Sequence, residues 1–176
     1  MQKKVQIISD GSLDLSQELT KEKDIEVVPF YVSFDSETYQ KEMVEVGVRE
    51  FYQEMVDHPT VFPKTSMPSV HDYYEVFEKY AKEQLPVICI CITRKFSGSL
   101  QSATTAKDMI LEEYPDAQIT VIDSTVNTVL QGLYVLEACR LRDMGLEYQQ
   151  IVDALLPIRE TGRIFFTIGS IDYLKH

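Results

Sequence analysis

VICICITRKFSGSLQSATTAKDMILEEYPDAQITVIDS, residues 87–124, carries the strongest signal for the fold. VICICIT (87–93) is apolar throughout, as expected for a strand buried on both faces of a parallel sheet. SLQSATTAKDMILEEY (99–114) is typical of a helix, and QITVIDS (118–124) reads as a second short buried strand. A strand, a helix and another strand in this order predict a parallel βαβ unit with a right-handed crossover.

The same alternation extends toward the N-terminus. Residues 5–9 predict a strand that ends in DGS and is followed by a helix over 14–23. Residues 26–34 are rich in Val, Phe and Tyr and predict a second strand, with Pro29 at an edge or bulge. The apolar spacing of 48–56 predicts an amphipathic helix.

The segment HPTVFPKTSMPSV (58–70) contains three prolines, so we expect an irregular loop at a cleft. A helix over 72–84 follows, with Ser69 as its N-cap. Residues 128–145 predict another helix with Gly145 at its C-terminal end. Residues 147–160 predict a weaker helix interrupted by Pro157.

RIFFTIG (163–169) predicts a last strand, after which the sequence stops as a new unit begins. We therefore expect residues 1–160 to form one α/β lobe and 161–176 to begin an incomplete second lobe. The predicted fold of the first lobe is a three-layer α/β domain with a mainly parallel, Rossmann-like sheet.

The charge of the chain argues against polyanionic partners. Seventeen Lys and Arg against 28 Asp and Glu give a formal net charge of -11, which repels nucleic acid and anionic lipid surfaces. The N-terminus does not resemble a secretory signal, and no apolar run is long enough to span a membrane. We expect a cytoplasmic protein without stable membrane anchoring. Cys89 and Cys91 alternate in an apolar strand and are expected in the core rather than at a redox or metal site.

The turns DGS, RKFSGS and DSTVN all follow predicted parallel strands, so they are expected along one edge of the sheet. FSGSLQS places Ser97, Ser99 and Ser102 at a helix N-terminus, where free N–H groups attract anions. The turn matches neither the P-loop nor the dinucleotide-binding pattern, and it lacks G-x-S-x-G. The plainer interpretation is that Ser97 or Ser99 only caps the helix.

Two other polar segments also fit either a functional or a purely structural role. PKTSMPS offers Thr65, Ser66 and Ser69, whose neutral hydroxyls suit binding a carboxylate better than cleaving a bond, although an ordinary turn before a helix also fits. Asp10 and Asp14 suit acid/base work or a cation, but such residues more often cap a helix. His58 and His71 lack companion ligands for a metal.

Four motifs in order resemble the DegV family of bacterial fatty-acid-binding proteins. The family's D-S-T-x-D-L, V-V-P-L-x-V, K-T-S-Q-P-S and L-S-G-T-x-Q-S-A motifs are matched by DGSLDL (10–15), VVPFYV (27–32), KTSMPS (64–69) and FSGSLQSA (96–103). VIDS (121–124) and the final YLK also fit. Each motif alone is weak, but the ordered set spans nearly the whole chain. The sequence departs from the pattern at Gly11, Met67 and the pair Arg94-Lys95.

The resemblance implies a lipid carrier rather than an enzyme. A long-chain fatty acid such as palmitate or oleate would lie in an apolar tunnel, with its carboxylate held by Thr65 and Ser97. Ser66, Gly98, Ser99 and Asp10 are the further ligand-binding candidates, and no cofactor, metal or catalytic residue is expected. A separate ATP-dependent fatty acid kinase would convert the bound acid to an acyl phosphate.

The resemblance also implies a second lobe over the acyl chain, which we expect to be truncated here, leaving an apolar patch. An alternative function is a small hydrolase or phosphotransferase that uses Ser97 or Asp10. A third is a structural or interacting domain without ligand.

Overall fold

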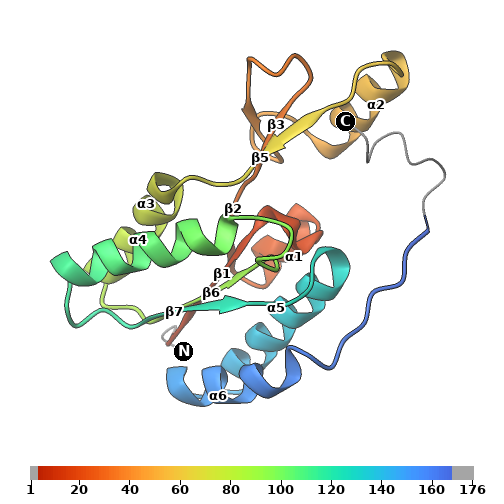
Figure 1. Ribbon diagram of the computed structural model, residues 1–176. Coiled ribbons are helices and arrows are strands. Elements are labelled where there is room, and N and C mark those ends of the chain that lie inside the picture. The colour runs from red at the N-terminus through yellow and green to blue at the C-terminus, as the bar shows by residue number, and fades with distance from the viewer. Residues whose placement is uncertain (1–3, 168–176) are drawn as a thin grey trace.

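The computed structural model describes residues 4–167 of the chain (Figure 1). At its centre is a parallel sheet of four strands in the order β2-β1-β6-β7. These strands are β1 (Gln6–Asp10), β2 (Ile25–Val28), β6 (Val87–Cys91) and β7 (Ile119–Asp123). The parallel sheet predicted from residues 87–124 is confirmed.

Helices cover both faces of this sheet and complete the three predicted layers (Figure 1). One face carries α3 (Val70–Lys82) and α4 (Ser99–Glu113). The other carries α5 (Thr128–Asp143) and α6 (Tyr148–Ile158). The short helices η1 (Gly11–Leu13) and α1 (Gln17–Glu22) follow β1.

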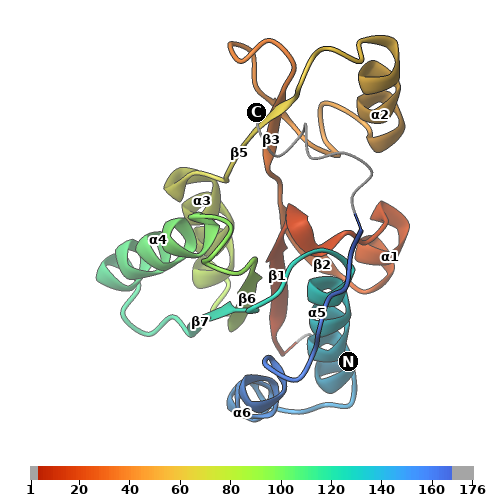
Figure 2. The same cartoon turned by 45° about the vertical axis from the view of Figure 1, so that its right-hand side comes forward.

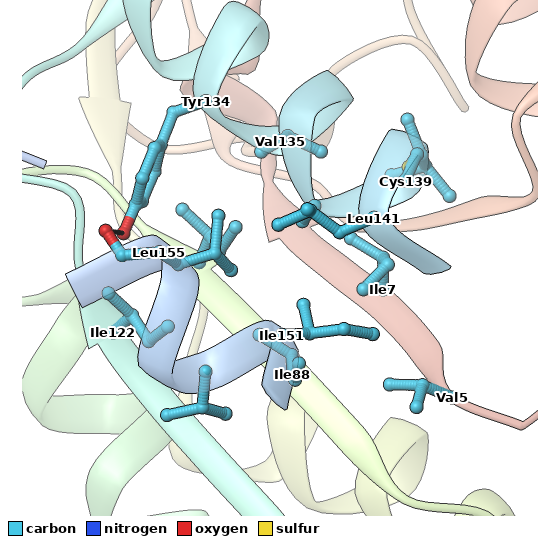
Figure 3. Close-up of a cluster of buried hydrophobic side chains, with 14 of the residues drawn as sticks. Val5, Ile7, Ile88, Ile122, Tyr134, Val135, Cys139, Leu141, Ile151 and Leu155 are labelled. Atoms are coloured by element: carbon cyan, nitrogen blue, oxygen red, sulfur yellow. Dashed lines mark hydrogen bonds between the residues drawn. The ribbon is translucent and has the colours of Figure 1, made fainter. Parts of the chain in front are cut away.

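The alternation of side chains along the strands builds two cores. Ile7, Ile88 and Ile122 pack against Val135 of α5 and Ile151 of α6 (Figure 3). On the opposite face, Ile8, Cys89 and Cys91 pack against α3 and α4. All five residues of VICIC are buried, because the strand has a helix layer on each side. The prediction that Cys89 and Cys91 are core residues is confirmed.

A small antiparallel sheet stands apart from the three layers (Figure 2). Its strands are β3 (Tyr31–Ser33), β4 (Gln40–Lys41) and β5 (Lys64–Ser66), in the order β4-β3-β5, and α2 (Val48–Asp57) accompanies them. Two predictions were wrong here. Residues 26–34 form not one strand but two in different sheets, because the chain turns at Pro29. The segment 58–70 is not wholly irregular, because β5 pairs with β3.

The C-terminal elements agree only in part with the sequence. Gly145 adopts a φ of 87° after α5, as the predicted helix end requires. Pro157 does not interrupt α6, which continues to Ile158. The strand predicted at 163–169 is wrong for 163–167, which are irregular, and 168–169 lie outside the described residues. Within residues 4–167 no helix combines the length and apolar character needed to cross a bilayer.

Candidate ligand-binding site

The turns after β1, β6 and β7 meet at one edge of the parallel sheet. The Ser124 N–H donates to the Cys91 carbonyl over 3.0 Å, and the Thr93 N–H donates to the Val126 carbonyl over 3.0 Å. β1 and β6 are neighbours in the sheet. The strand that follows β1 lies toward one edge of the sheet, and the strand that follows β6 lies toward the other. Such a switch point, at the carboxyl ends of the strands, is where open α/β sheets bind ligands.

Asp10 joins these turns from the inside. Its side chain is fully buried. The carboxylate accepts hydrogen bonds from the Ile92 N–H (2.9 Å), the Ser99 hydroxyl (2.7 Å), the Gln131 amide (2.8 Å) and the Ser12 hydroxyl (3.1 Å). Burial raises the pKa of Asp10, and these bonds oppose the rise. Asp10 therefore holds the turns together beneath their surface.

Ser99 is buried with Asp10, whereas Ser97 and Gly98 lie nearer the surface. The Ser99 hydroxyl also bonds the hydroxyl of Tyr73 on α3 over 2.6 Å. The half-buried Ser97 accepts the Ser99 N–H at its Oγ over 3.2 Å, while Gly98 occupies the cap position of α4. Neither serine caps α4 in the predicted way, and the Ser97 O–H keeps a proton that it can donate.

The second predicted loop approaches this turn. Met67 lies over Gly98, because its Sδ is 2.6 Å from the position that a Cβ at residue 98 would take. Thr65 pairs with Val32 across β5 and β3 and borders a cavity. Ser66 is the next residue of β5, so its side chain points to the opposite face of the strand. Thr65 and Ser66 are thus separated by the strand geometry.

The cavity has a volume of about 910 Å³ and lies between the parallel sheet edge, α1, α2 and the small sheet. Its wall is largely apolar, with contributions from Leu13, Leu15, Val27, Val32, Val46 and Phe51. The volume falls within the range typical of small-molecule sites. The wall also carries many polar and charged side chains, among them Lys21, Glu42 and Thr65.

Four carboxylates also border the cavity: Asp14, Glu18, Glu26 and Glu42. Partial burial raises the pKa of Asp14 and Glu42, and for Glu42 the nearby Asp14 and Asp10 add to the rise. Glu42 accepts the Phe30 N–H over 3.1 Å. Its carboxylate occupies the space that a Cβ at Gly11 would need, so a side chain at residue 11 requires Glu42 to move. Neither Asp10 nor Asp14 caps α1, whose cap is Ser16.

Asp72 fastens the small sheet to α3. It accepts hydrogen bonds from the Tyr31 hydroxyl of β3 (2.8 Å) and the Ser69 N–H (2.8 Å), and it pairs with Lys41 of β4 (3.1 Å). Burial raises the pKa of Asp72, but the bonds from Ser69 and Tyr31 outweigh this effect and lower it to about 2. Ser69 is the N-cap of α3, as predicted, and its Oγ accepts the Asp72 N–H.

Sequence reasoning did not find Asp72, Tyr73 or Gln131. The only local signal was the spacing of Ser69 and Asp72, which is that of a capping box. The histidines take no part in this region as far as the structure describes it: His58 pairs with Glu54, His71 pairs with Glu75, and both are exposed. Among residues 4–167 no cluster of His, Cys, Asp and Glu is arranged to hold a metal ion.

Comparisons with known proteins agree on one family. The model of the DegV family, described as "Uncharacterised protein, DegV family", matches residues 4–176. A DegV domain-containing protein of Clostridium perfringens is 29% identical over 97% of this chain and 59% of its own length. Another from Clostridium acetobutylicum is 34% identical over 87% of this chain and 53% of its own length.

Solved structures with a similar fold include fatty-acid-binding proteins. A stearic-acid-binding protein from Eubacterium ventriosum superposes with a TM-score of 0.93 and is 47% identical, over 97% of this chain and 58% of that protein. A fatty-acid-binding DegV family protein from Thermus thermophilus gives a TM-score of 0.74 at 29% identity, over 89% of this chain and 53% of that protein. The chain therefore spans between half and three fifths of the length of these relatives.

Proposed function

This chain belongs to the DegV family, and on that premise we propose that it binds a long-chain fatty acid, such as palmitate or oleate, as a carrier rather than as a catalyst. The observation that carries the proposal is the apolar cavity of about 910 Å³, bordered by Thr65. Transfer of an acyl chain from water into such a cavity is favourable by about 0.8 kcal/mol for each buried CH₂ group. The cavity would then supply the affinity.

The carboxylate head is assigned to the Thr65 end of the cavity, near the contact of Met67 with Gly98; Ser97 and Gly98 themselves do not border the cavity. In this proposal the Thr65 and Ser97 hydroxyls donate hydrogen bonds to it, beside the N-terminus of α4. The unpaired N–H groups of a helix N-terminus favour an anion. The contact of Met67 with Gly98 supports this arrangement because it brings the two loops together.

The other candidate residues receive different roles. Asp10 and Ser99 are buried and bonded to each other, so we assign them to positioning the turn that contains Ser97. Ser66 is assigned to the opposite face of β5 from Thr65. A carboxylate at Asp10 would in any case repel the anionic head group if the two were in contact.

The first test is chemical identification of the ligand. Protein purified from a bacterial host is denatured, and the released lipid is measured by mass spectrometry, together with the affinity of lipid-stripped protein for stearate. Thr65→Val and Ser97→Ala should each weaken stearate binding by about tenfold or more, because each removes a hydrogen bond to a charged group. Ser66→Ala is the matched control and should bind as tightly as the parent protein.

Two results would reject the proposal. One is the absence of both released fatty acid and measurable stearate affinity. The other is turnover of acyl esters or nucleotides that Ser97→Ala abolishes, which would favour the hydrolase or phosphotransferase alternative. A loss of affinity in Ser66→Ala equal to that in Thr65→Val would reject the assignment of the head group to one face of β5.

We further propose, from the family resemblance, that the bound acid is presented to an ATP-dependent fatty acid kinase. The γ-phosphoryl group of ATP would be transferred to the carboxylate oxygen, giving an acyl phosphate and ADP. The partial exposure of the loops around Ser97 supports access by a partner. Incubation of the loaded protein with the kinase and labelled ATP should yield a hydroxylamine-sensitive product. Equal yield from free fatty acid alone would contradict presentation by this chain.

A further inference from the structure

Helix α2 is unusual among the longer helices because its apolar side has little protein to pack against. All ten residues of α2 are described, and none of them is buried. Val48 is 52% exposed, Tyr52 60% and Val56 71%. These residues are spaced by four along the helix and so form one stripe. An amphipathic helix normally turns such a stripe toward a core.

The surroundings of α2 do not provide that core. In the described part of the chain, no other helix or strand packs extensively along α2, and both ribbon views place it beside the small sheet, away from the three layers (Figures 1 and 2). Its principal aromatic contact is between Phe51 and Phe34, with ring centroids 5.1 Å apart. The helix therefore has few contacts with the other elements of the described chain.

The cavity indicates what the stripe faces. Val48, Phe51 and Tyr52 border the same space of about 910 Å³ that Thr65, Leu15 and Val27 border, whereas Val56 does not. We propose that α2 is a flap whose cavity-facing side chains, Val48, Phe51 and Tyr52, pack against the acyl chain itself, so that a long chain completes the packing of this part of the helix. This inference rests on the proposed function and adds to it a role for α2 in selecting chain length.

The effect on α2 should depend on the length of the acyl chain, because the head group and the far end of the chain contact different parts of the site. A short acid can place its carboxylate at Thr65 and Ser97 while leaving part of the α2 stripe in water. Only a chain long enough to fill the apolar space can remove Phe51 and Tyr52 from water, and apolar contact area is what stabilises a packed helix. Occupancy by a long chain should then order α2, whereas a short chain should not.

Hydrogen exchange on the 176-residue protein tests this directly. Exchange of the α2 amides is measured without ligand, with saturating decanoate and with saturating stearate, and retention of each acid is checked by mass spectrometry. Stearate should slow exchange in α2 by about tenfold or more, and decanoate by much less, because protection follows the free energy of local opening.

Two variants separate α2 from the rest of the cavity. Phe51→Ala should weaken stearate binding by roughly tenfold and decanoate binding little, since it removes buried apolar contact from the distal part of the site. Val56→Ala is the matched control: the residue lies on the same helix, does not border the cavity and is more exposed. It should leave both affinities unchanged. Tyr52→Ala provides a second cavity-facing change if Phe51→Ala does not fold.

The outcomes of these measurements distinguish the flap from the proposed function. Bound stearate with unchanged α2 exchange would overturn the flap and leave the proposed function intact. No bound stearate would overturn the proposed function and this inference with it. Protection of α2 that depends on protein concentration and not on stearate would show that a second copy of the chain covers the stripe, which also overturns the inference.

Discussion

The Asp10 carboxylate shows how one buried side chain fixes the shape of a ligand site. It receives donors from the turn that follows its own strand, from the β6–α4 turn and from Gln131 on α5. A buried carboxylate is costly unless its oxygens are paired, and here both oxygens accept hydrogen bonds. The same bonds connect the C-terminal ends of β1 and β6 to α5.

Replacing Asp10 by Ala should lower the free energy of unfolding by about 2 to 4 kcal/mol, because it leaves several buried donors without an acceptor. Urea denaturation followed by circular dichroism measures the change. Asp14→Asn is the control: Asp14 is exposed and adopts a φ of 50°, a conformation that Asn tolerates, so its stability should change little. An equal decrease in the free energy of unfolding in the two variants would contradict a stabilising role for the Asp10 hydrogen bonds.

At the scale of elements, Asp72 links α3 to the small sheet that contains Thr65. The lowered pKa of its carboxyl, about 2 against the usual value of 3.8, means that the folded state favours the ionised form. This contribution to stability is complete above the unfolded pKa and is lost as the pH falls through 3.8 toward 2. The Asp72 carboxylate therefore makes the docking of the small sheet acid-sensitive.

Asp72→Asn should remove this sensitivity. At pH 7 the variant should be less stable than the parent by about 1 kcal/mol, since it loses a charged cap and two partners of the charged form. The difference should shrink between pH 4 and pH 2, because the parent then loses its ionised Asp72. Urea midpoints across this range measure it. A constant difference at every pH would contradict the role of the ionised carboxylate.

The elements that the sequence predicts well are those with a strong local pattern. VICIC and the helix over 99–114 could be placed because a continuous apolar run and a helical stretch meet in one βαβ unit. β5 could not be placed, because its three residues KTS are polar and become a strand only by pairing with β3. The break at Pro29 was visible in sequence, but not that the chain changes sheets there.

The candidate site was predictable only as far as its motifs. Thr65, Ser97 and Gly98 lie on recognisable loops, and their two loops do approach each other at Met67. Gln131 and Tyr73 could not be found, because each is an ordinary helix residue until the fold brings it to Asp10 and Ser99 over 121 and 26 positions of sequence. Long-range hydrogen bonds of this kind leave no local pattern.

At the scale of the whole molecule, two parts of the fold contribute different residues to the candidate site. The three-layer body has a core on each side of its sheet, and Asp10 bonds the turn that contains Ser97 through Ile92 and Ser99. The small sheet and α2 have fewer buried side chains and supply Thr65 and much of the cavity wall. A ligand that contacts both parts should therefore stabilise the molecule by joining them.

Thermal unfolding with matched ligands tests this division. Stearate at about 100 times its dissociation constant should stabilise the folded state by about 2.7 kcal/mol. For a chain of this size that corresponds to a rise in Tm of about 5 to 10 °C. Methyl stearate has the same acyl chain but no charged head, so it should bind more weakly and, at the same concentration, raise the Tm by much less, because it lacks the charge-assisted bonds assigned to Thr65 and Ser97. Equal shifts for the acid and the ester would mean that the cavity alone recognises the ligand, and would contradict the head-group assignment.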